Sequence, residues 1–244
     1  MRTLQLTLAY DGTNYVGWQR QANGVSIQQL VEEAFVPLVG SMPTVAGASR
    51  TDAGVHALGQ VASVSLDTAY ESAAIQGALN FRLPPDIRVA AIADQRIGFH
   101  ARSHAIGKTY RYRVSVSPVL SPFDRWFVWH APEARDVDAM RRAAAALIGR
   151  HDFASFQARG TTIVDTTRTI QRLDIRTADG ELVVEVDGDG FLRHMVRAIV
   201  GTLVECGSGA RAPEGMAAML AARDRQAAGA TAPASGLTLM SVRY

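Results

Sequence analysis

Several features that mark other classes of protein are scarce or absent in this sequence. Its 244 residues hold one cysteine, Cys206, so an internal disulfide is excluded and a reducing compartment is expected. No apolar run approaches the roughly 18 residues that a transmembrane helix needs, so no membrane partner is expected. The first residues alternate apolar and polar side chains and lack the apolar stretch of a secretory signal, which also favours the cytoplasm.

Sequence motifs for cofactors and metals are lacking as well. GxGxxG does not occur, and the segment GKT (107–109) is not the end of a P-loop, because Arg102 stands where that motif needs glycine. His100 and His104 are four residues apart, but no Glu, Asp or Cys accompanies them at the spacing of a zinc site. We therefore expect neither a cofactor nor a metal.

Lysine is nearly absent, and arginine supplies the positive charge. Of 25 basic residues 24 are arginines and one is Lys108, against 23 acidic residues, for a formal net charge of +2. A GC-rich genome would produce the same bias. Between Arg82 and Arg113, however, seven basic residues stand against two acidic ones, and arginine forks bind phosphate oxygens and stack on bases. This stretch is a candidate RNA-facing strip or an ordinary solvated surface.

The hydrophobic pattern of the first half switches repeatedly between the period of a strand and that of a helix. Hydrophobic residues make up 48% and charged residues 20% of the chain, as in an ordinary globular protein. The expected order is β-α-β-β-α-β. The predicted elements are a strand over 4–10, a helix from Ser26 with Gln29 completing a capping box, strands over 45–48 and 61–66, a helix over 69–83 and a strand over 87–92.

The second half repeats this order less regularly, so we expect an α+β fold of two halves, 1–105 and 106–244, each with an antiparallel sheet. The predicted elements are a strand over 109–117, a helix capped by Asp136 with Ile148 on its apolar stripe, a hairpin of 173–176 and 182–186 around Asp179-Gly180, a helix over 191–205, a short helix from Pro213 and a strand over 237–244.

A single carboxylate lies in the segment ASRTDAGVHALGQV (48–61), between two predicted strands of the first half. Asp52 follows Arg50 by two residues, and Gly54 and Gly59 come after it. A turn is the simplest interpretation, because Asp bonds to nearby backbone and Gly tolerates positive φ. A reactive carboxylate is the alternative, and only the rest of the chain can favour it.

Taken together, motifs along the whole chain resemble those of the tRNA pseudouridine synthase A family. Each motif alone is short, but they occur in family order and span practically the full length. They are YDGTNYVGWQRQ (10–21), SRTDAGVHALGQV (49–61), LPPDIRV (83–89), FHAR (99–102), KTYRY (108–112), HDFASF (151–156), GDGFLRHMVRAIVG (188–201) and APASGLTLMSVRY (232–244).

The resemblance implies a fold, a partner and a reaction. The implied fold has two ferredoxin-like β-α-β-β-α-β halves, whose antiparallel sheets join around a central cleft. The implied activity is that of a homodimeric isomerase, which converts uridine to pseudouridine at positions 38, 39 and 40 of the tRNA anticodon stem-loop. This reaction transfers ribose C1′ from N1 to C5 of the same uracil. No atoms enter or leave, which agrees with the expectation that no cofactor or metal takes part.

The resemblance also assigns the central chemical roles. Asp52 is implied as the nucleophile, since carboxylates form covalent intermediates of this kind. Arg197 is implied as its ion-pair partner, because a nearby cation keeps a carboxylate ionised where burial in an apolar cleft would oppose this. Arg193 and Arg197 lie four residues apart in the predicted helix and off its apolar stripe, which agrees with that role.

Further residues are implied to contact the substrate. Tyr110 would stack on the uracil that has left the helical stack, and whether it also acts as a general base stays open. Arg50 would contact the RNA where the base departs, and His56 and Gln60 are additional substrate-binding candidates.

The resemblance also leads to predictions about small residues around the carboxylate. Gly47, Gly54 and Gly59 would let the backbone approach a nucleotide closely. The family usually has glycine directly before Arg-Thr-Asp, where Ser49 stands here. If that position needs positive φ, serine adds strain of about 1 kcal/mol.

Two other functions remain possible at this stage. A noncatalytic tRNA-binding or tRNA-folding protein could use the same cleft, although a pure binder has no use for an anion such as Asp52 facing phosphates. A metal-dependent phosphodiesterase built on Asp52 and His56 is the other, and activity that resists EDTA would exclude it.

Overall fold

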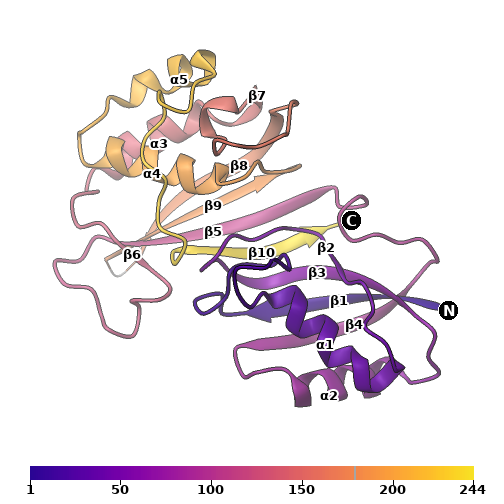
Figure 1. Ribbon diagram of the computed structural model, residues 1–244. Helices are drawn as coiled ribbons and strands as arrows, with labels where there is room; N and C mark the ends of the chain where they lie inside the picture. Colours follow the sequence, from indigo (N-terminus) through magenta and orange to yellow (C-terminus); the bar gives the residue numbers. More distant parts are fainter. Residues whose placement is uncertain (179) are drawn as a thin grey trace. The chain divides into compact units, whose positions relative to one another are not determined.

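The computed structural model describes residues 1–178 and 180–244, which form two compact units (Figure 1). Unit 1 consists of Met1–Ile106 and Thr238–Tyr244, and unit 2 of Gly107–Leu237. The sequence-based division placed all of 106–244 in the second half. The final strand clusters with unit 1 instead, because it pairs in parallel with the strand that follows the carboxylate loop, Thr238 opposite His56.

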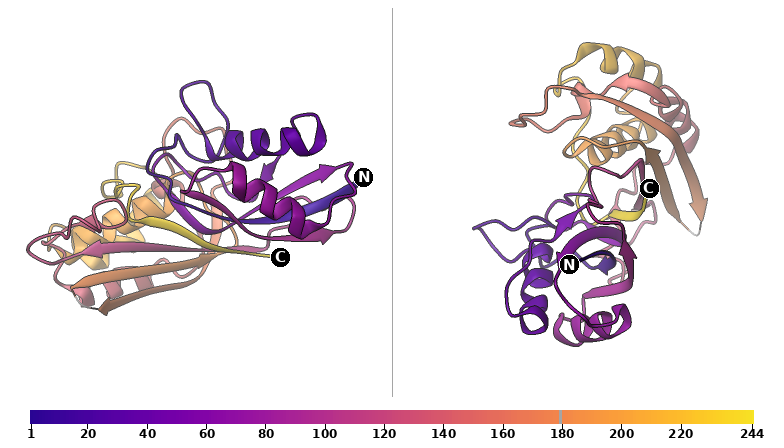
Figure 2. Two further views of the ribbon diagram at one scale, coloured as in Figure 1. Left: turned by 90° about the horizontal axis from the view of Figure 1, so that it is seen from below. Right: turned by 90° about the vertical axis from the view of Figure 1, so that its right-hand side faces the viewer.

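Unit 1 has the predicted β-α-β-β-α-β order. β1 pairs antiparallel with both β3 and β4, and β3 also pairs with β10, so the order across the sheet is β4-β1-β3-β10, with the short β2 paired to β3 off this path. Both helices cover one face of this sheet (Figures 1 and 2). The elements are β1 (Arg2–Tyr10), α1 (Ile27–Val39), β2 (Ala46–Gly47), β3 (His56–Leu66), α2 (Ser72–Arg82), β4 (Ile87–Gln95) and, at the end of the chain, β10 (Leu237–Arg243).

The core of unit 1 follows from the alternation in β1. Leu4, Leu6 and Leu8 are fully buried, as the period of two predicts, while the residues between them are partly exposed. The predicted cap of α1 is confirmed, since the Ser26 hydroxyl accepts a hydrogen bond from the Gln29 N–H at 3.2 Å. The Gln29 side chain does not complete the box but donates to a neighbouring glutamate on the helix.

The strand after the carboxylate begins earlier than predicted. β3 starts at His56, five residues before the expected Val61, so the loop of the carboxylate motif is short. The early part of β3 pairs with the end of β1, Gln60 opposite Leu8, across an irregularity in the register. Gly59 lies in this part of the strand, and a side chain there would overlap the backbone carbonyl of Met240 in β10.

Unit 2 is also α+β, with sheet order β5-β9-β8-β7 and β6 paired in parallel with β5. The strands β6 and β7 are additions to the predicted order. The elements are β5 (Gly107–Ser115), β6 (Trp129–His130), α3 (Val137–Ala145), β7 (Gly149–Asp152), a 3-10 turn η1 (Ala154–Phe156), β8 (Thr167–Ala178), β9 (Glu181–Gly188), α4 (Met195–Gly207), a second 3-10 turn η2 (Pro213–Gly215) and α5 (Met216–Ala222).

Some of the sequence-based predictions for helices and strands of unit 2 are confirmed and others are wrong. The Asp136 side chain caps α3 by accepting from the Ala139 N–H at 2.8 Å, as predicted. Ile148 is exposed, contrary to the expected stripe, because α3 ends three residues before it. β8 and β9 form the predicted hairpin, although both strands are longer than expected. Of its turn, Gly180 has the positive φ of 77°, and Asp179 lies outside the described residues.

The start of α4 departs from the prediction. The helix begins at Met195, four residues after the expected Phe191, and His194 before it has a left-handed φ of 62°. Arg193 is therefore not on the helix and does not share a face with Arg197. In its described residues the chain has no helix both long enough and apolar enough to span a membrane.

Candidate active site

Asp52 occupies the first position of a tight turn in unit 1. The Val55 N–H donates to the Asp52 carbonyl at 3.1 Å, and Gly54 has φ of 76°, as the third residue of a type II turn requires. The turn interpretation of this segment is therefore correct for the backbone. Asp52 is half-buried and Arg50 is exposed. The turn thus carries a partly exposed carboxylate two residues after an exposed cation in sequence.

The backbone at the start of this turn is held by the first of the motifs named above, residues 10–21. Gly17 forms an isolated β-bridge with Asp52, and the Trp18 N–H donates to the Thr51 carbonyl at 3.0 Å. A Cβ on Gly17 would lie 2.5 Å from that carbonyl oxygen, and its φ of +103° also favours glycine. The carbonyls of Gly17 and Trp18 in turn accept from the first two residues of α1. The position of Asp52 therefore depends on a helix end 25 residues away in sequence.

Aromatic residues fill the space behind the turn. The Tyr10 hydroxyl shares a 2.8 Å hydrogen bond with the Thr51 hydroxyl, and Trp18 is almost fully buried, with its ring 6.2 Å from that of Tyr10. A side chain at Gly47 would overlap the Trp18 ring. Close approach to protein atoms thus explains Gly47, and backbone conformation explains Gly54. Neither requires the nearby nucleotide that the sequence suggested.

Gln60, named above as a substrate-binding candidate, holds the carboxylate loop through Ser49. Its side chain has no exposed surface. The amide oxygen accepts from the Ser49 N–H at 3.1 Å, and the amide nitrogen donates to the Ser49 carbonyl at 2.7 Å. The only described non-glycine residues with positive φ are His194 and Arg223, so Ser49 has an ordinary backbone and the strain considered for it does not arise.

His56 is likewise part of the fold interior. It is buried, and the Gly12 N–H donates to its Nδ1 at 3.1 Å. A carboxylate oxygen of Asp11 lies 3.1 Å from the same nitrogen. These contacts fix the ring against the start of the 10–21 motif. They give no support to substrate binding by His56 or to a phosphodiesterase site built on it.

Unit 2 supplies an aromatic pair at the predicted stacking residue. Tyr110 lies on β5 opposite Val186 of β9 and is buried. Its ring meets the Phe191 ring edge to face, with centroids 5.2 Å apart and planes at 86°. Sequence reasoning assigned no role to Phe191, although it lies in the same motif as Arg197. An aromatic ring held in this way suits stacking on a planar base.

Arg197 lies in the first turn of α4, where a cation is unfavourable. The helix dipole opposes a positive charge there by roughly 0.3–1 kcal/mol, so helix stability does not explain the residue. Its Nε donates to the Ala232 carbonyl at 2.8 Å, and the Ala232 N–H donates back to the Arg197 carbonyl at 3.1 Å. The guanidinium is thereby fixed to the segment that precedes β10.

Tyr112 holds the same segment from the other side. Its hydroxyl donates to the Pro233 carbonyl at 2.7 Å, and a side chain at Gly236 would overlap its ring. Burial raises the pKa of the Tyr112 hydroxyl above its ordinary value, with the positive charge of Arg197 opposing this rise. The motifs 108–112 and 188–201 therefore meet the first part of the motif 232–244, residues 232–237, within unit 2. Their spacing in sequence gives no sign of this.

The expected site residues are divided between the units. Asp52 and Arg50 belong to unit 1, and Tyr110 and Arg197 to unit 2. The ion pair between Asp52 and Arg197 stays a prediction. Unit 1 therefore offers a carboxylate on a fixed turn. Unit 2 offers an aromatic ring and a fixed guanidinium.

The candidate RNA-facing strip from Arg82 to Arg113 is divided in sequence between the two units, and several of its cations are used internally. The Arg88 guanidinium donates to the Pro84 carbonyl at 2.6 Å, and Arg111 and Arg113 form ion pairs of 2.7 Å with glutamates of β9. Sequence clustering of arginine overstated the free positive charge there.

The site combines residue types that suit covalent chemistry on a nucleobase. Consistent with this, a model of the tRNA pseudouridine synthase family matches residues 7–102 and 143–244. The chain belongs to this family. A tRNA pseudouridine synthase A of Syntrophotalea carbinolica is 49% identical over 100% of this chain and 97% of its own length. Its counterpart in Geobacter sulfurreducens is 46% identical over 100% of both chains.

Among solved structures the similarity is more distant. A chain in the crystal structure of a Cbf5-Nop10-Gar1 complex aligns with 97% of this chain and 48% of its own length, at 9% identity and a TM-score of 0.41. The family assignment rests on the sequence matches.

Proposed function

We propose that this chain is an isomerase that converts uridine to pseudouridine at positions 38, 39 and 40 of the tRNA anticodon stem-loop. Membership of the tRNA pseudouridine synthase family supports the reaction and the class of substrate. The observation that carries the proposal is the Asp52 turn. Gly17 and Trp18 hold the backbone of this turn, while the Asp52 residue stays partly exposed.

In this proposal Asp52 is the nucleophile. The bond between uracil N1 and ribose C1′ breaks, and the carboxylate holds one fragment covalently while the base turns. A bond then forms between C5 and C1′, the covalent bond to the Asp52 carboxylate breaks, the proton on C5 is lost, and N1 gains a proton. A turn that is already ordered keeps the carboxylate in reach of the substrate without further loss of backbone freedom.

Residues of unit 2 complete the proposed site. Arg197 would form an ion pair with Asp52 and hold it ionised, and the carbonyl of Ala232 fixes the guanidinium for this purpose. Tyr110 would stack on the extruded uracil, with Phe191 bracing its ring from the edge. Arg50, exposed beside the turn, would contact a phosphate of the RNA.

Two further parts of the proposal rest on the family resemblance alone. We propose that the enzyme is a homodimer and acts in the cytoplasm. Sedimentation of the purified protein at micromolar concentration tests the first part, and a monomer at that concentration would contradict it. Fractionation of the native cells tests the second.

The function is tested with purified protein and unmodified tRNA transcripts that carry uridines in the anticodon arm. The reaction is run in EDTA, with Asp52→Ala in parallel, and pseudouridine is mapped by stops at carbodiimide adducts. Stops at positions 38 to 40 with wild type only are expected. Tight binding without stops would overturn the proposal and favour the noncatalytic tRNA-binding protein. Activity that EDTA abolishes would point to metal-dependent chemistry instead.

A further inference from the structure

Most arginines of unit 2 already have partners. Along β5, β8 and β9, three arginines surround the buried Glu185 carboxylate: Arg111 at 2.7 Å, Arg172 at 3.5 Å and Arg176 at 2.5 Å. Arg113 pairs with a second glutamate of β9. Because acids offset these cations, this part of the sheet offers little net charge to a polyanion such as RNA.

Three arginines of unit 2 differ from the rest. The side chains of Arg150, Arg159 and Arg193 are exposed, and none makes a hydrogen bond or lies within 4.0 Å of a carboxylate anywhere in residues 1–178 and 180–244. Exposed arginines usually find a local acid or carbonyl, as the others in this unit do. We call these three residues the arginine end of unit 2.

Backbone contacts bring Arg159 and Arg193 together. The Ala158 N–H, one residue before Arg159, donates to the Arg193 carbonyl at 2.9 Å. The segment that connects β7 to β8 therefore lies against the segment that leads into α4. The left-handed backbone of His194 turns the chain here, so that Arg193 leaves the helix and faces solvent.

Arg150 is the second residue of β7, the strand that leads into the same connection (Figure 1). The Phe153 N–H donates to the Thr166 carbonyl at 3.0 Å and closes the base of the connection. The pKa of Asp165 is lowered, first by the hydrogen bond from the backbone N–H two residues on and then by the positive charges of Arg168 and Arg150. The positive charges of Arg150 and Arg168 therefore both act on the Asp165 carboxylate.

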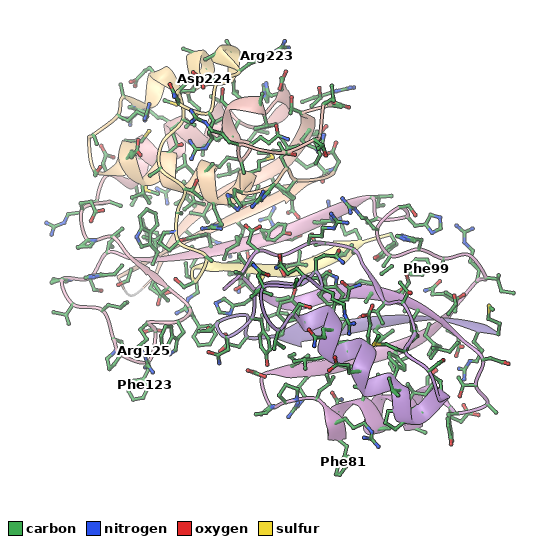
Figure 3. All side chains as sticks on the ribbon, viewed as in Figure 1. Phe81, Phe99, Phe123, Arg125, Arg223 and Asp224 are labelled. Carbon is green, nitrogen blue, oxygen red and sulfur yellow. The ribbon has the colours of Figure 1, made fainter. Side chains whose placement is uncertain are left out.

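The acids of this region are engaged elsewhere. Asp152 lies 2.8 Å from Arg223, which Figure 3 labels near the end of α5. The Asp189 carboxylate accepts from the Thr169 N–H at 2.9 Å. Asp165 is likewise occupied by a backbone N–H at 2.9 Å. The region thus keeps its acids in local contacts and its three arginines without ion pairs.

The arginine end begins next to the predicted stacking residue. Phe191, two residues before Arg193, packs edge to face on Tyr110. We propose that the arginine end binds phosphates of the tRNA strand that flanks the target uridine. The inference rests on the proposed function, since it takes tRNA as the substrate. Planar guanidinium groups suit phosphate oxygens, and such contacts supply affinity and position without reading sequence.

The test replaces all three residues at once, as Arg150→Gln, Arg159→Gln and Arg193→Gln. Binding of an unmodified tRNA transcript is measured over a series of salt concentrations, with pseudouridine formation measured in parallel. Each phosphate contact contributes about 0.7–0.9 to the slope of log K against log salt, so the slope should fall by about 2–3. At 0.15 M salt Kd should rise about 10- to 100-fold, from the same relation.

The kinetic readout separates positioning from chemistry. KM should rise with Kd, whereas kcat at saturating tRNA should stay within about threefold, because none of the three residues touches the reacting atoms. Thermal unfolding should be nearly unchanged, since exposed side chains without partners contribute little to stability.

A second triple variant controls for net charge. It changes three exposed arginines near α3 that have local partners, and it should alter the salt slope by less than about 1. Its substitutions are Arg135→Gln, Arg141→Gln and Arg142→Gln, whose partners are the Pro132 carbonyl, Asp138 and Glu214.

Three results would overturn the inference: a wild-type slope in the first triple variant, equal losses in both variants, or a fall in kcat with unchanged binding. A wild-type slope would mean that the arginine end does not bind tRNA phosphates and instead serves another acidic partner, such as a protein. If wild type binds tRNA but makes no pseudouridine, and the first variant still loses affinity and slope, the arginine end stands and the proposed function fails.

Discussion

The two units hold their candidate site residues in different ways. In unit 1 the backbone around Asp52 is fixed, by Gly17 and by the Trp18 N–H, and the carboxylate lies at the end of this support. In unit 2 the side chains themselves are held, Arg197 by the Ala232 carbonyl and Tyr110 by a ring contact. The difference separates reactivity from stability: a change at Asp52 should affect chemistry alone, whereas a change at Arg197 should affect both.

The largest effect is expected from Asp52→Asn. Turnover of tRNA should fall by more than about 10⁴-fold, since loss of a nucleophile has effects of this size or larger. The free energy of unfolding and the affinity for tRNA should change little, because main-chain atoms make the turn. Pseudouridine assays, thermal unfolding and tRNA binding measure the three quantities.

Asp94→Asn is the matched control for this change. Asp94 lies on β4 and pairs with Arg2 at 2.8 Å, away from the turn, so its replacement should leave turnover intact. Substantial residual turnover in Asp52→Asn would remove Asp52 as the nucleophile. A large loss of stability would show that unit 1 does not separate chemistry from folding.

Two tyrosines on β5 allow a second comparison. Tyr110→Phe should lower turnover by about 10²–10⁴-fold if the hydroxyl acts as general base, and only slightly if the ring merely stacks. Tyr112→Phe removes the 2.7 Å hydrogen bond to Pro233 and should cost about 1 kcal/mol of unfolding free energy with little loss of turnover. Single-turnover rates and denaturant unfolding separate these effects. The opposite pattern would exchange the roles given to the two residues.

Arg197→Ala should affect both turnover and stability. We expect turnover to fall about 10²-fold, far more than tRNA affinity, because the predicted partner Asp52 loses its cation. Unfolding free energy should fall by about 1–2 kcal/mol, since the Ala232 carbonyl loses its donor. Rates at saturating tRNA, Kd and denaturant unfolding are the measurements.

Arg225→Ala controls for the structural part of this effect. Its guanidinium donates to the Gly229 carbonyl at 2.8 Å and to the Thr231 hydroxyl at 2.8 Å, within the segment that Arg197 also holds. A similar loss of stability with nearly normal turnover is expected. If both variants lose turnover equally, Arg197 acts through the segment and not through Asp52.

Prediction from sequence was sound where the signal is local. The Ser26 and Asp136 caps and the alternation of β1 were identified correctly, because each depends on residues within one element. The support of Asp52 by Gly17 and Trp18 was not identified, because Gly17 and Asp52 are 35 residues apart in sequence and only the fold brings them together.

The errors in unit 2 have a similar cause. Arg193 and Arg197 were placed on one helix face because four-residue spacing is helical, but His194 adopts a left-handed conformation that histidine rarely takes. In unit 1, Gln60 was named as a substrate-binding candidate because it lies in the carboxylate motif, and that role stays a prediction. Its full burial against Ser49 depends on the pairing of β3 with β1, which motif spacing does not reveal.

The smallest predicted effect on turnover concerns Gln60→Ala. The substitution removes the Gln60 amide atoms that bind the buried Ser49 N–H at 3.1 Å and the Ser49 carbonyl at 2.7 Å. We expect the free energy of unfolding to fall by about 1–3 kcal/mol. Ser49 lies three residues before Asp52, so a looser loop should slow turnover about 10-fold through misplacement of the carboxylate.

Gln76→Ala is the control. It loses side-chain hydrogen bonds to β4 carbonyls at 3.1 and 2.9 Å, and it should destabilise the protein less and leave turnover intact. Because Gln60 is buried, tRNA affinity should stay at the wild-type value. A selective loss of affinity would return Gln60 to the substrate-binding role and show that rigidity of the unit 1 backbone is not what fixes Asp52.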